Sequence, residues 1–146
     1  MPVTIGVLRE TVRGENRVAI VPEVATRLAA QGARILVERG AGAAARFPDA
    51  AYKDVSFADS ADAVISEADV LLAVQPPAAS IVPRLKPGAI VAGFLAPHAQ
   101  AALVRALKER RITSFAMELV PRISRAQSMD ALSSQALVSG YRCAVV

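Results

Sequence analysis

The stretch Asp69–Val74, DVLLAV, decides the fold class that this sequence encodes. After its first residue it is a continuous apolar run, and the polar and proline-rich triplet Gln75–Pro77 follows it directly. A short apolar run bounded by a turn signal is typical of a strand that is buried on both faces. DVLLAV therefore indicates a strand inside a parallel sheet, because surface antiparallel strands alternate apolar and polar residues.

Apolar runs of the same kind recur along the chain, and segments with helical signals separate them. Pro22 opens a helical segment that ends before Gly32, and Ser60 can cap a second segment that ends near Ala68. The other expected strands are Val3–Leu8, Ala33–Glu38, Val55–Ala58, Gly88–Leu95 and Ile112–Met117, and the other expected helices are Ser80–Leu85, Pro97–Arg110 and one from Ala126.

This alternation predicts an α/β fold with a doubly wound, mostly parallel sheet that is either flavodoxin-like or Rossmann-like. In such folds, ligands bind beyond the carboxyl ends of the strands. The first candidates for a site are therefore the residues that follow the expected strands: Arg9 and Glu10, Gly40–Gly42, Gln75–Pro77, Ala96–His98 and Glu118–Arg122.

The composition bounds the class of protein. The 146 residues suit one domain, and 53% hydrophobic residues exclude a disordered chain. No apolar run approaches the length of a membrane span. The 17 basic and 13 acidic residues give a net charge of +4, but scattered cations and few aromatic residues disfavour nucleic acid as a partner. The single cysteine, Cys143, excludes an internal disulfide, and the single histidine, His98, leaves no metal-ligand spacing and is expected at the surface.

The loop Gly40–Gly42 follows an expected strand, as a phosphate-binding loop would. Position 45 is Ala45, which the glycine-rich dinucleotide fingerprint tolerates. However, Phe47 and Pro48 interrupt the helix that should begin there. A tight turn is therefore the favoured interpretation.

The densest polar segment of the chain, residues 122–134, follows the last expected strand. If it is helical, Gln127, Asp130 and Ser134 share one face. The Arg122 guanidinium can fork onto an oxygen-bearing group, and the Gln127 and Asp130 side chains can hold a carboxamide or a ribose. The alternative is a capped helix start with Ser124 as the cap.

The end of the chain predicts a long apolar helix. Residues 126–146 contain no proline and no stop signal, and such a helix would be about 30 Å long, as long as the whole domain. It could fold back onto the sheet. Cys143 is embedded in this apolar helix, so it is expected to be an inert, packed thiol. We favour the alternative that the chain is one piece of a larger assembly, or has been cut.

Residues 120–134, VPRISRAQSMDALSS, closely resemble the nucleotide-proximal loop in the NAD-binding alpha subunit of proton-translocating NAD(P) transhydrogenases. The opening of the chain agrees, with Ile5–Val7, then Arg9 and Glu10, then Glu15–Ala19, and then Pro22. This opening is shared by transhydrogenases and alanine dehydrogenases. The loop motif is the more specific of the two and covers the polar segment.

The resemblance implies an enzyme that passes a hydride between NADH and NADP⁺, coupled to proton translocation. It implies NAD(H) as cofactor, with NADP(H) on a partner subunit, and it places Arg122, Gln127, Asp130 and Ser133 near the nicotinamide, with Gln127 and Asp130 as catalytic residues. The implied partners are membrane-embedded and NADP-binding subunits and a second copy of the chain. The implied location is cytoplasmic and peripheral to the inner membrane, through those partners.

The resemblance also implies two regions within the chain. Residues 1–125 would form the N-terminal α/β domain, and residues 126–146 would start an interdomain helix that leads to an absent NAD-binding domain. An alanine dehydrogenase would need a lysine near Gln75 and a histidine near Ala96, which this sequence lacks. The alternatives are nevertheless an alanine dehydrogenase-like domain and a non-catalytic half-domain that acts only in assembly.

Overall fold

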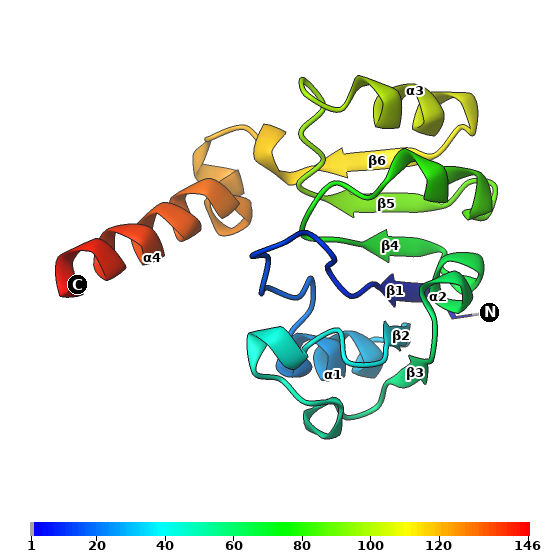
Figure 1. Cartoon of the computed structure of the whole chain (residues 1–146), viewed down its shortest axis with the longest axis horizontal. Helices are drawn as coiled ribbons and strands as arrows, with labels where there is room; N and C mark the ends of the chain where they lie inside the picture. The colour runs from blue at the N-terminus through cyan, green and yellow to red at the C-terminus, as the bar shows by residue number, and fades with distance from the viewer. Residues whose placement is uncertain (1) are drawn as a thin grey trace.

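Residues 2–146 are described by a computed structural model, in which one parallel sheet organises the chain (Figure 1). All pairings between the six strands are parallel, and the spatial order is β3-β2-β1-β4-β5-β6. The strands are β1 (Thr4–Val7), β2 (Arg34–Glu38), β3 (Ser56–Ala58), β4 (Val70–Leu72), β5 (Ile90–Gly93) and β6 (Thr113–Ala116).

This topology confirms the predicted α/β class and selects between its two forms. The order 3-2-1-4-5-6 is that of the doubly wound Rossmann fold, whereas a flavodoxin-like sheet follows 2-1-3-4-5. The order reverses between β1 and β4, which pair over Ile5–Val7 and Val70–Leu72. The crevice beyond the carboxyl ends of these two strands is the expected ligand region of such a sheet.

Four α-helices accompany the sheet. Ser60 caps α2 as predicted, because its hydroxyl accepts a hydrogen bond from the Ala63 N–H, and Pro22 occupies the first turn of α1. The helices are α1 (Pro22–Ala30), α2 (Ala61–Glu67), α3 (Ala101–Glu109) and α4 (Ala131–Val145), and short 3-10 segments span Ala43–Ala45, Asp49–Ala51, Ala79–Arg84, Met117–Leu119 and Ser124–Met129.

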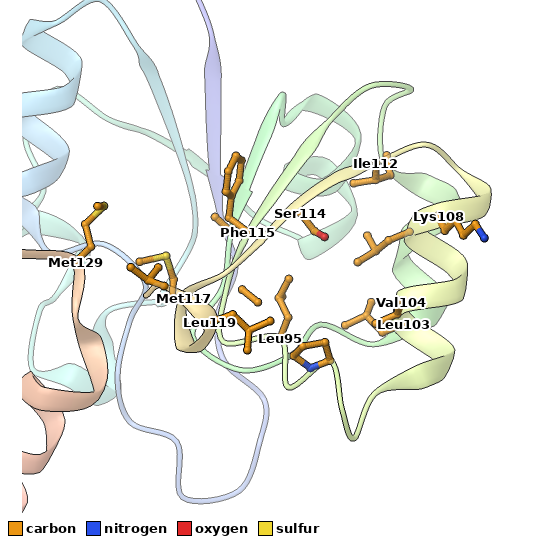
Figure 2. A pocket seen from close by; sticks show the side chains of 15 residues that line it. Leu95, Leu103, Val104, Lys108, Ile112, Ser114, Phe115, Met117, Leu119 and Met129 are labelled. Atoms are coloured by element: carbon orange, nitrogen blue, oxygen red, sulfur yellow. The ribbon is translucent and has the colours of Figure 1, made fainter. Parts of the chain in front are cut away.

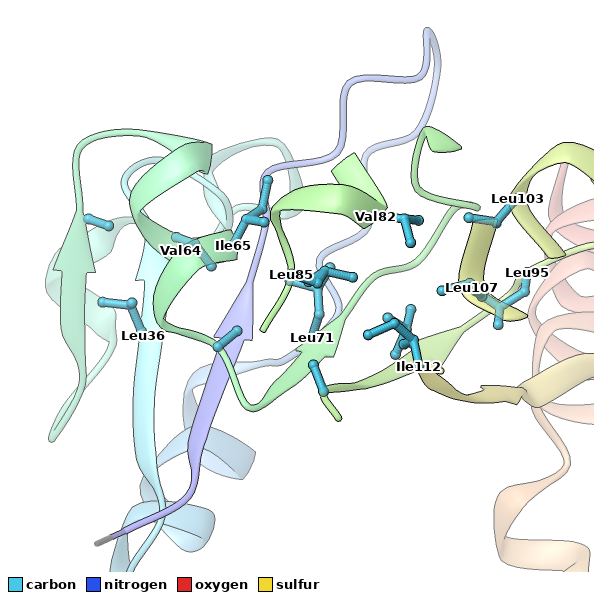
Figure 3. Close-up of a cluster of buried hydrophobic side chains, with 14 residues drawn as sticks. Leu36, Val64, Ile65, Leu71, Val82, Leu85, Leu95, Leu103, Leu107 and Ile112 are labelled. Carbon is cyan, nitrogen blue, oxygen red and sulfur yellow. The ribbon is translucent and has the colours of Figure 1, made fainter. Parts of the chain in front are cut away.

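Two apolar clusters hold these layers together. The first packs α2, α3 and the Ala79–Arg84 segment against the sheet around Leu71 and Val91, and Figure 3 shows its side chains converging from these elements. The second packs α1 against Val7, Ile35 and Val37 of the two neighbouring strands. Buried apolar surface on both sides of the sheet stabilises the fold at about 25 cal/mol per Å².

Two predicted helices differ from expectation. The helix predicted from Pro97 begins at Ala101, because Ala96 has a positive φ of 43° and its carbonyl closes a turn with the N–H groups of Ala99 and Gln100. The segment predicted as a helix over Ser80–Leu85 is a 3-10 segment that contains Pro83, which has no N–H to donate.

The predicted helix from Ala126 is also corrected. A 3-10 segment occupies Ser124–Met129, and α4 begins only at Ala131. Figure 1 shows α4 running away from the body on the side to which the strand arrows point, rather than folding back over the sheet. Cys143 on this helix is exposed, so the expectation of a packed thiol is wrong.

Candidate functional site

Two glutamates tie the loops together at the carboxyl edge of the central strands. The Glu38 carboxylate, at the end of β2, accepts a hydrogen bond from the Arg9 N–H after β1 at 2.8 Å. The Glu10 carboxylate, after β1, accepts from the N–H groups of Val74 at 2.6 Å and Gln75 at 3.3 Å, after β4. Each carboxylate therefore satisfies main-chain donors of a neighbouring strand, and the crevice between β1 and β4 has a fixed shape.

Glu118 does the same after β6. Its carboxylate accepts hydrogen bonds from the N–H groups of Leu95 and Ala96, which follow β5. This contact fixes the loop in which Ala96 takes its left-handed conformation. The segment that leaves β6 and leads to residues 122–134 is therefore anchored to the neighbouring strand where it starts.

A second polar group lies beside the crevice, centred on Glu15 and Arg17. Both oxygens of the Glu15 carboxylate bind the Arg17 guanidinium, at 2.8 Å to Nε and 2.6 Å to Nη2. The Gln75 side-chain amide donates to Glu15 at 2.6 Å, and Arg17 lies over the Phe94 ring at 5.7 Å. The hydrogen bond from Arg17 lowers the pKa of Glu15 to about 2, against the opposing effect of burial and with further help from Gln75.

Beyond β6 the chain forms the C-terminal arm, residues 121–146. Most of its side chains are exposed, and Ala126, at 5% relative exposure, is its only buried residue. The hydrogen bonds within the start of the arm are local, as from the Ala126 N–H to the Ile123 carbonyl at 2.9 Å. Ala126 is thus the point where the polar segment rests on the body.

The polar segment curls around a cavity of about 620 Å³. The four residues for which the resemblance implied a place near a nicotinamide all line it, and so does Ser134. The complete lining is Arg122, Ile123, Ser124, Gln127, Asp130, Ser133 and Ser134. The structure therefore brings the predicted residues together, although a 3-10 turn and the start of a helix do this instead of one helical face.

Asp130 is the N-cap of α4, so the alternative in which Ser124 caps the helix is wrong. Its carboxylate accepts from the Ser133 N–H at 3.0 Å and from the Ser133 hydroxyl at 2.6 Å. The Arg122 guanidinium lies 3.9 Å from the same carboxylate. The hydrogen bonds from Ser133 lower the pKa of Asp130, and Arg122 adds a smaller effect in the same direction.

Arg122 and Gln127 keep capacity for a ligand. The Arg122 side chain is 63% exposed and meets Asp130 only at the edge of ion-pair distance. Gln127 is exposed, and its main-chain carbonyl, not its side chain, accepts the Asp130 N–H at 3.2 Å. Within the portion of the chain that the structure describes, no hydrogen bond engages the Gln127 side chain.

The other candidates from the sequence have structural roles. Gly40–Gly42 is a tight turn, as favoured, and the Asp49 carboxylate binds the Gly40 N–H at 2.9 Å, where a phosphate would need that donor. His98 is exposed, as expected. Across residues 2–146, no three His, Cys, Asp or Glu side chains lie close enough to hold a metal ion, and no helix is long and apolar enough to cross a membrane.

A second cavity, of about 720 Å³, lies between α3 and β6 (Figure 2). Its lining is apolar apart from Lys108 and Ser114 and includes the exposed side chains of Phe115 and Leu119. These two polar side chains compare with six in the lining of the arm cavity. The polar cavity of the arm is therefore the candidate functional site.

The contact between Glu15, Arg17 and Gln75 was not predicted from the sequence. Glu15 and Arg17 belong to the family-like opening of the chain, and no local pattern there indicates that they meet Gln75. Their positions after β1 and β4 could have indicated that they lie close together, since residues that follow neighbouring parallel strands meet at one edge of the sheet.

Fold and site together define a Rossmann-like domain with a polar cavity beyond the carboxyl ends of its parallel strands. The family described as "Alanine dehydrogenase/PNT, N-terminal domain" matches residues 6–139, and the chain belongs to this family.

Individual relatives agree with this assignment. The chain is 42% identical over 143 residues to "NAD(P) transhydrogenase subunit alpha" of Cereibacter sphaeroides, a match that covers 97% of this chain and 27% of the relative. It is 36% identical over 118 residues to "Alanine dehydrogenase" of Mycobacterium tuberculosis, covering 80% and 32%. The solved transhydrogenase from Sinorhizobium meliloti superposes with a TM-score of 0.90 at 36% identity, covering 97% of this chain and 43% of that one. The chain thus spans less than half the length of each of these relatives.

Proposed function

We propose that this chain is the N-terminal domain of the NAD(H)-binding subunit of an NAD(P) transhydrogenase, which transfers a hydride between NADH and NADP⁺ coupled to proton translocation. The observation that carries the proposal is the polar cavity of about 620 Å³, lined by Arg122, Gln127, Asp130 and Ser133. The names of the transhydrogenase relatives supply the reaction class. Ligand cavities commonly have volumes of roughly 300–1,000 Å³.

The donors and acceptors of the cavity match a carboxamide, the polar group of nicotinamide. The Ser133 hydroxyl donates its hydrogen bond to Asp130, so the lone pairs of its oxygen remain free to accept from the amide NH₂. The Arg122 guanidinium offers only donors, and these suit the amide oxygen. Together, Arg122 and Ser133 would hold both ends of the carboxamide and fix the orientation of the ring.

In this arrangement Asp130 does not contact the ligand itself but holds the residues that do. Its carboxylate is occupied by Ser133 and faces Arg122, so it orients both of the groups that bind the carboxamide. An aspartate is ionised near neutrality, and the hydrogen bonds from Ser133 lower the pKa of Asp130 further, so Asp130 is no proton donor there.

Gln127 is the residue that would reach toward the second nucleotide. Its side chain is exposed, uncharged and able both to donate and to accept hydrogen bonds. An uncharged contact suits a reaction that changes the charge of each ring in both directions. The bound nucleotides supply the hydride chemistry, and the reacting carbons must approach to roughly 3–3.5 Å.

The proposal extends to the assembly. Residues 1–125 form the N-terminal domain, and residues 126–146 lead toward a nucleotide-binding domain, a division that the long departing α4 supports. The partners are a second copy of the chain, a subunit that binds NADP(H) and a membrane-embedded subunit. The domain would lie in the cytoplasm, attached to the inner membrane through these partners.

Alanine dehydrogenase activity is disfavoured by the crevice itself. The position that would need a lysine holds Gln75, whose amide is engaged by Glu15 at 2.6 Å. The position that would need a histidine holds Ala96, and its N–H is bound by Glu118. A role confined to assembly would not require the hydrogen-bond donors and acceptors that Arg122, Gln127 and Ser133 present to the cavity.

Single-turnover hydride transfer tests the proposal. The full-length subunit, mixed with its NADP(H)-binding partner, should oxidise NADH and reduce an NADP⁺ analogue, and replacing residues 120–134 with a Gly/Ser linker should abolish this transfer. NADH-dependent amination of pyruvate would support an alanine dehydrogenase instead. Transfer that survives replacement of the loop would support the assembly role.

A further inference from the structure

The C-terminal arm is joined to the body by very few polar contacts. Among residues 2–146, one hydrogen bond connects residues 121–146 with residues 2–120: Arg17 Nη1 donates to Gln135 Oε1 at 3.2 Å. The ion pair and the other side-chain hydrogen bonds of the arm lie within the arm itself. Apart from the apolar contact at the buried Ala126, the orientation of the arm therefore depends on this hydrogen bond.

Arg17 is held rigidly enough to serve as an anchor. Glu15, whose side chain is only 7% exposed, takes its Nε and Nη2 donors, and the Phe94 ring lies beneath the guanidinium. The remaining nitrogen, Nη1, points at Gln135. A planar guanidinium fixed along one side presents its other donors in a defined direction.

The hydrogen bond between Arg17 and Gln135 lies at the edge of a cavity. A cavity of about 400 Å³ lies between the ends of β4 and β5 and the start of α4, and both Arg17 and Gln135 line it. Close packing does not press this end of α4 onto the sheet. Gln135 follows Ser134 directly, so the tie acts on the helical turn that begins with Asp130 and carries Ser133.

We propose that Arg17, held by Glu15, is a positioning residue that sets the place of the cavity-lining segment 122–134 by binding Gln135. The proposal rests on the proposed function, because placement matters if that segment orients a nicotinamide. Arg17 does not line the arm cavity and acts only through α4.

The test variant is Gln135→Leu in the full-length subunit, since it removes the contact and leaves the Glu15–Arg17 pair intact. Amides of residues 122–135 should exchange with deuterium about fivefold faster, as expected for losing one exposed hydrogen bond to a charged group. Single-turnover hydride transfer should fall by a similar factor. Gln135→Glu, which keeps an acceptor for Arg17, should restore both values, and Ser139→Ala on the exposed part of α4 is the matched control.

A double-mutant cycle tests the pair directly. Arg17→Met added to Gln135→Leu should accelerate exchange no further, because the two residues act through one contact. Unchanged exchange in Gln135→Leu, additive effects in the cycle, or faster exchange with unchanged hydride transfer would each overturn the proposal. The exchange measurement needs no nucleotide or partner, so an unaltered subunit without hydride transfer would refute the proposed function alone.

Discussion

The body of the molecule, residues 2–118, and the C-terminal arm, residues 121–146, are stabilised in opposite ways. The body buries Leu71 completely within an apolar cluster that spans the sheet and its helices. The arm buries only Ala126, and its helix α4 exposes Leu137 to 75%. Burial fixes the body, whereas the Asp130 cap, the buried Ala126 and one bridging hydrogen bond hold the arm.

This difference separates rigidity from recognition. The body supplies a fixed edge, at which Glu10, Glu38 and Glu118 bind main-chain N–H groups of adjacent strands. The arm supplies the exposed donors and acceptors of Arg122 and Gln127. A helix of about 15 residues is marginal alone in water, so the start of α4 gains from its Asp130 cap and from Arg17.

The largest expected effect contrasts matched leucines. Leu71→Ala should lower the free energy of unfolding by about 2–5 kcal/mol, because it leaves a cavity in the core. Leu137→Ala should change it by less than about 0.5 kcal/mol, since the side chain is already exposed. Urea denaturation followed by circular dichroism measures both, and comparable losses would show that α4 is packed as tightly as the body.

A pH titration sharpens the contrast within the body. The folded state lowers the pKa of Glu15 from 4.5 to about 2, so its contribution to stability is present above pH 4.5 and is lost as pH falls to about 2. At 1.36 kcal/mol per pKa unit this shift corresponds to about 3 kcal/mol, and solvent screening at the 42% exposed Arg17 side chain reduces the contribution to the order of 2 kcal/mol. Denaturation at several pH values should show a shallower acid loss in Glu15→Gln. Parallel curves for the two proteins would contradict the assignment.

A conservative change in the arm should affect the reaction and leave the fold intact. Gln127→Asn keeps the amide and shortens its reach, so hydride transfer should slow by about tenfold or more, with NADH affinity changed by less than about threefold. Stopped-flow single turnovers and NADH titration measure these quantities. Gln31→Asn, on the exposed end of α1, is the control, and a loss explained by weaker NADH binding would contradict the role of Gln127.

The smallest expected effect distinguishes two roles of Asp130: capping α4, and orienting Arg122 and Ser133 through its negative charge. Asp130→Asn should keep α4, because asparagine caps helices as well as aspartate, whereas Asp130→Ala should cost about 1 kcal/mol of local helix stability. Both should weaken the orientation of Arg122 and Ser133 and so slow hydride transfer several-fold. Helix content by circular dichroism and single turnovers distinguish the two roles, and normal transfer in Asp130→Asn would mark a cap alone.

The body was predictable from sequence because its signals are local and repeated. Apolar runs such as DVLLAV at residues 69–74 indicated the strands, and Ser60 and Pro22 marked helix starts where the structure has them. The strand order was not predictable, since the pairing of Ile5 with Val70 depends on packing across 65 residues. The sequence therefore left two related topologies open.

For the arm, the sequence predicted which residues line the cavity but not the backbone conformation that brings them together. The polar residues around the cavity were identified, but a helix was expected through Gln127, where a 3-10 turn stands. Ser124 was the expected cap and Asp130 was not, although aspartate caps helices as well as serine does. The contact between Arg17 and Gln135 joins residues 118 positions apart, and no local pattern reports it.

The position of β1 has a consequence for synthesis on the ribosome. β1 pairs with β2 along one edge. Its other edge stays unpaired until β4 has been synthesised, and the last residue of β4 that pairs with β1 is Leu72. Translation at about 5–20 residues per second leaves this apolar edge open for a few seconds. An unpaired edge of this kind can recruit another chain, so the nascent protein is prone to aggregation at this edge until residue 72 emerges.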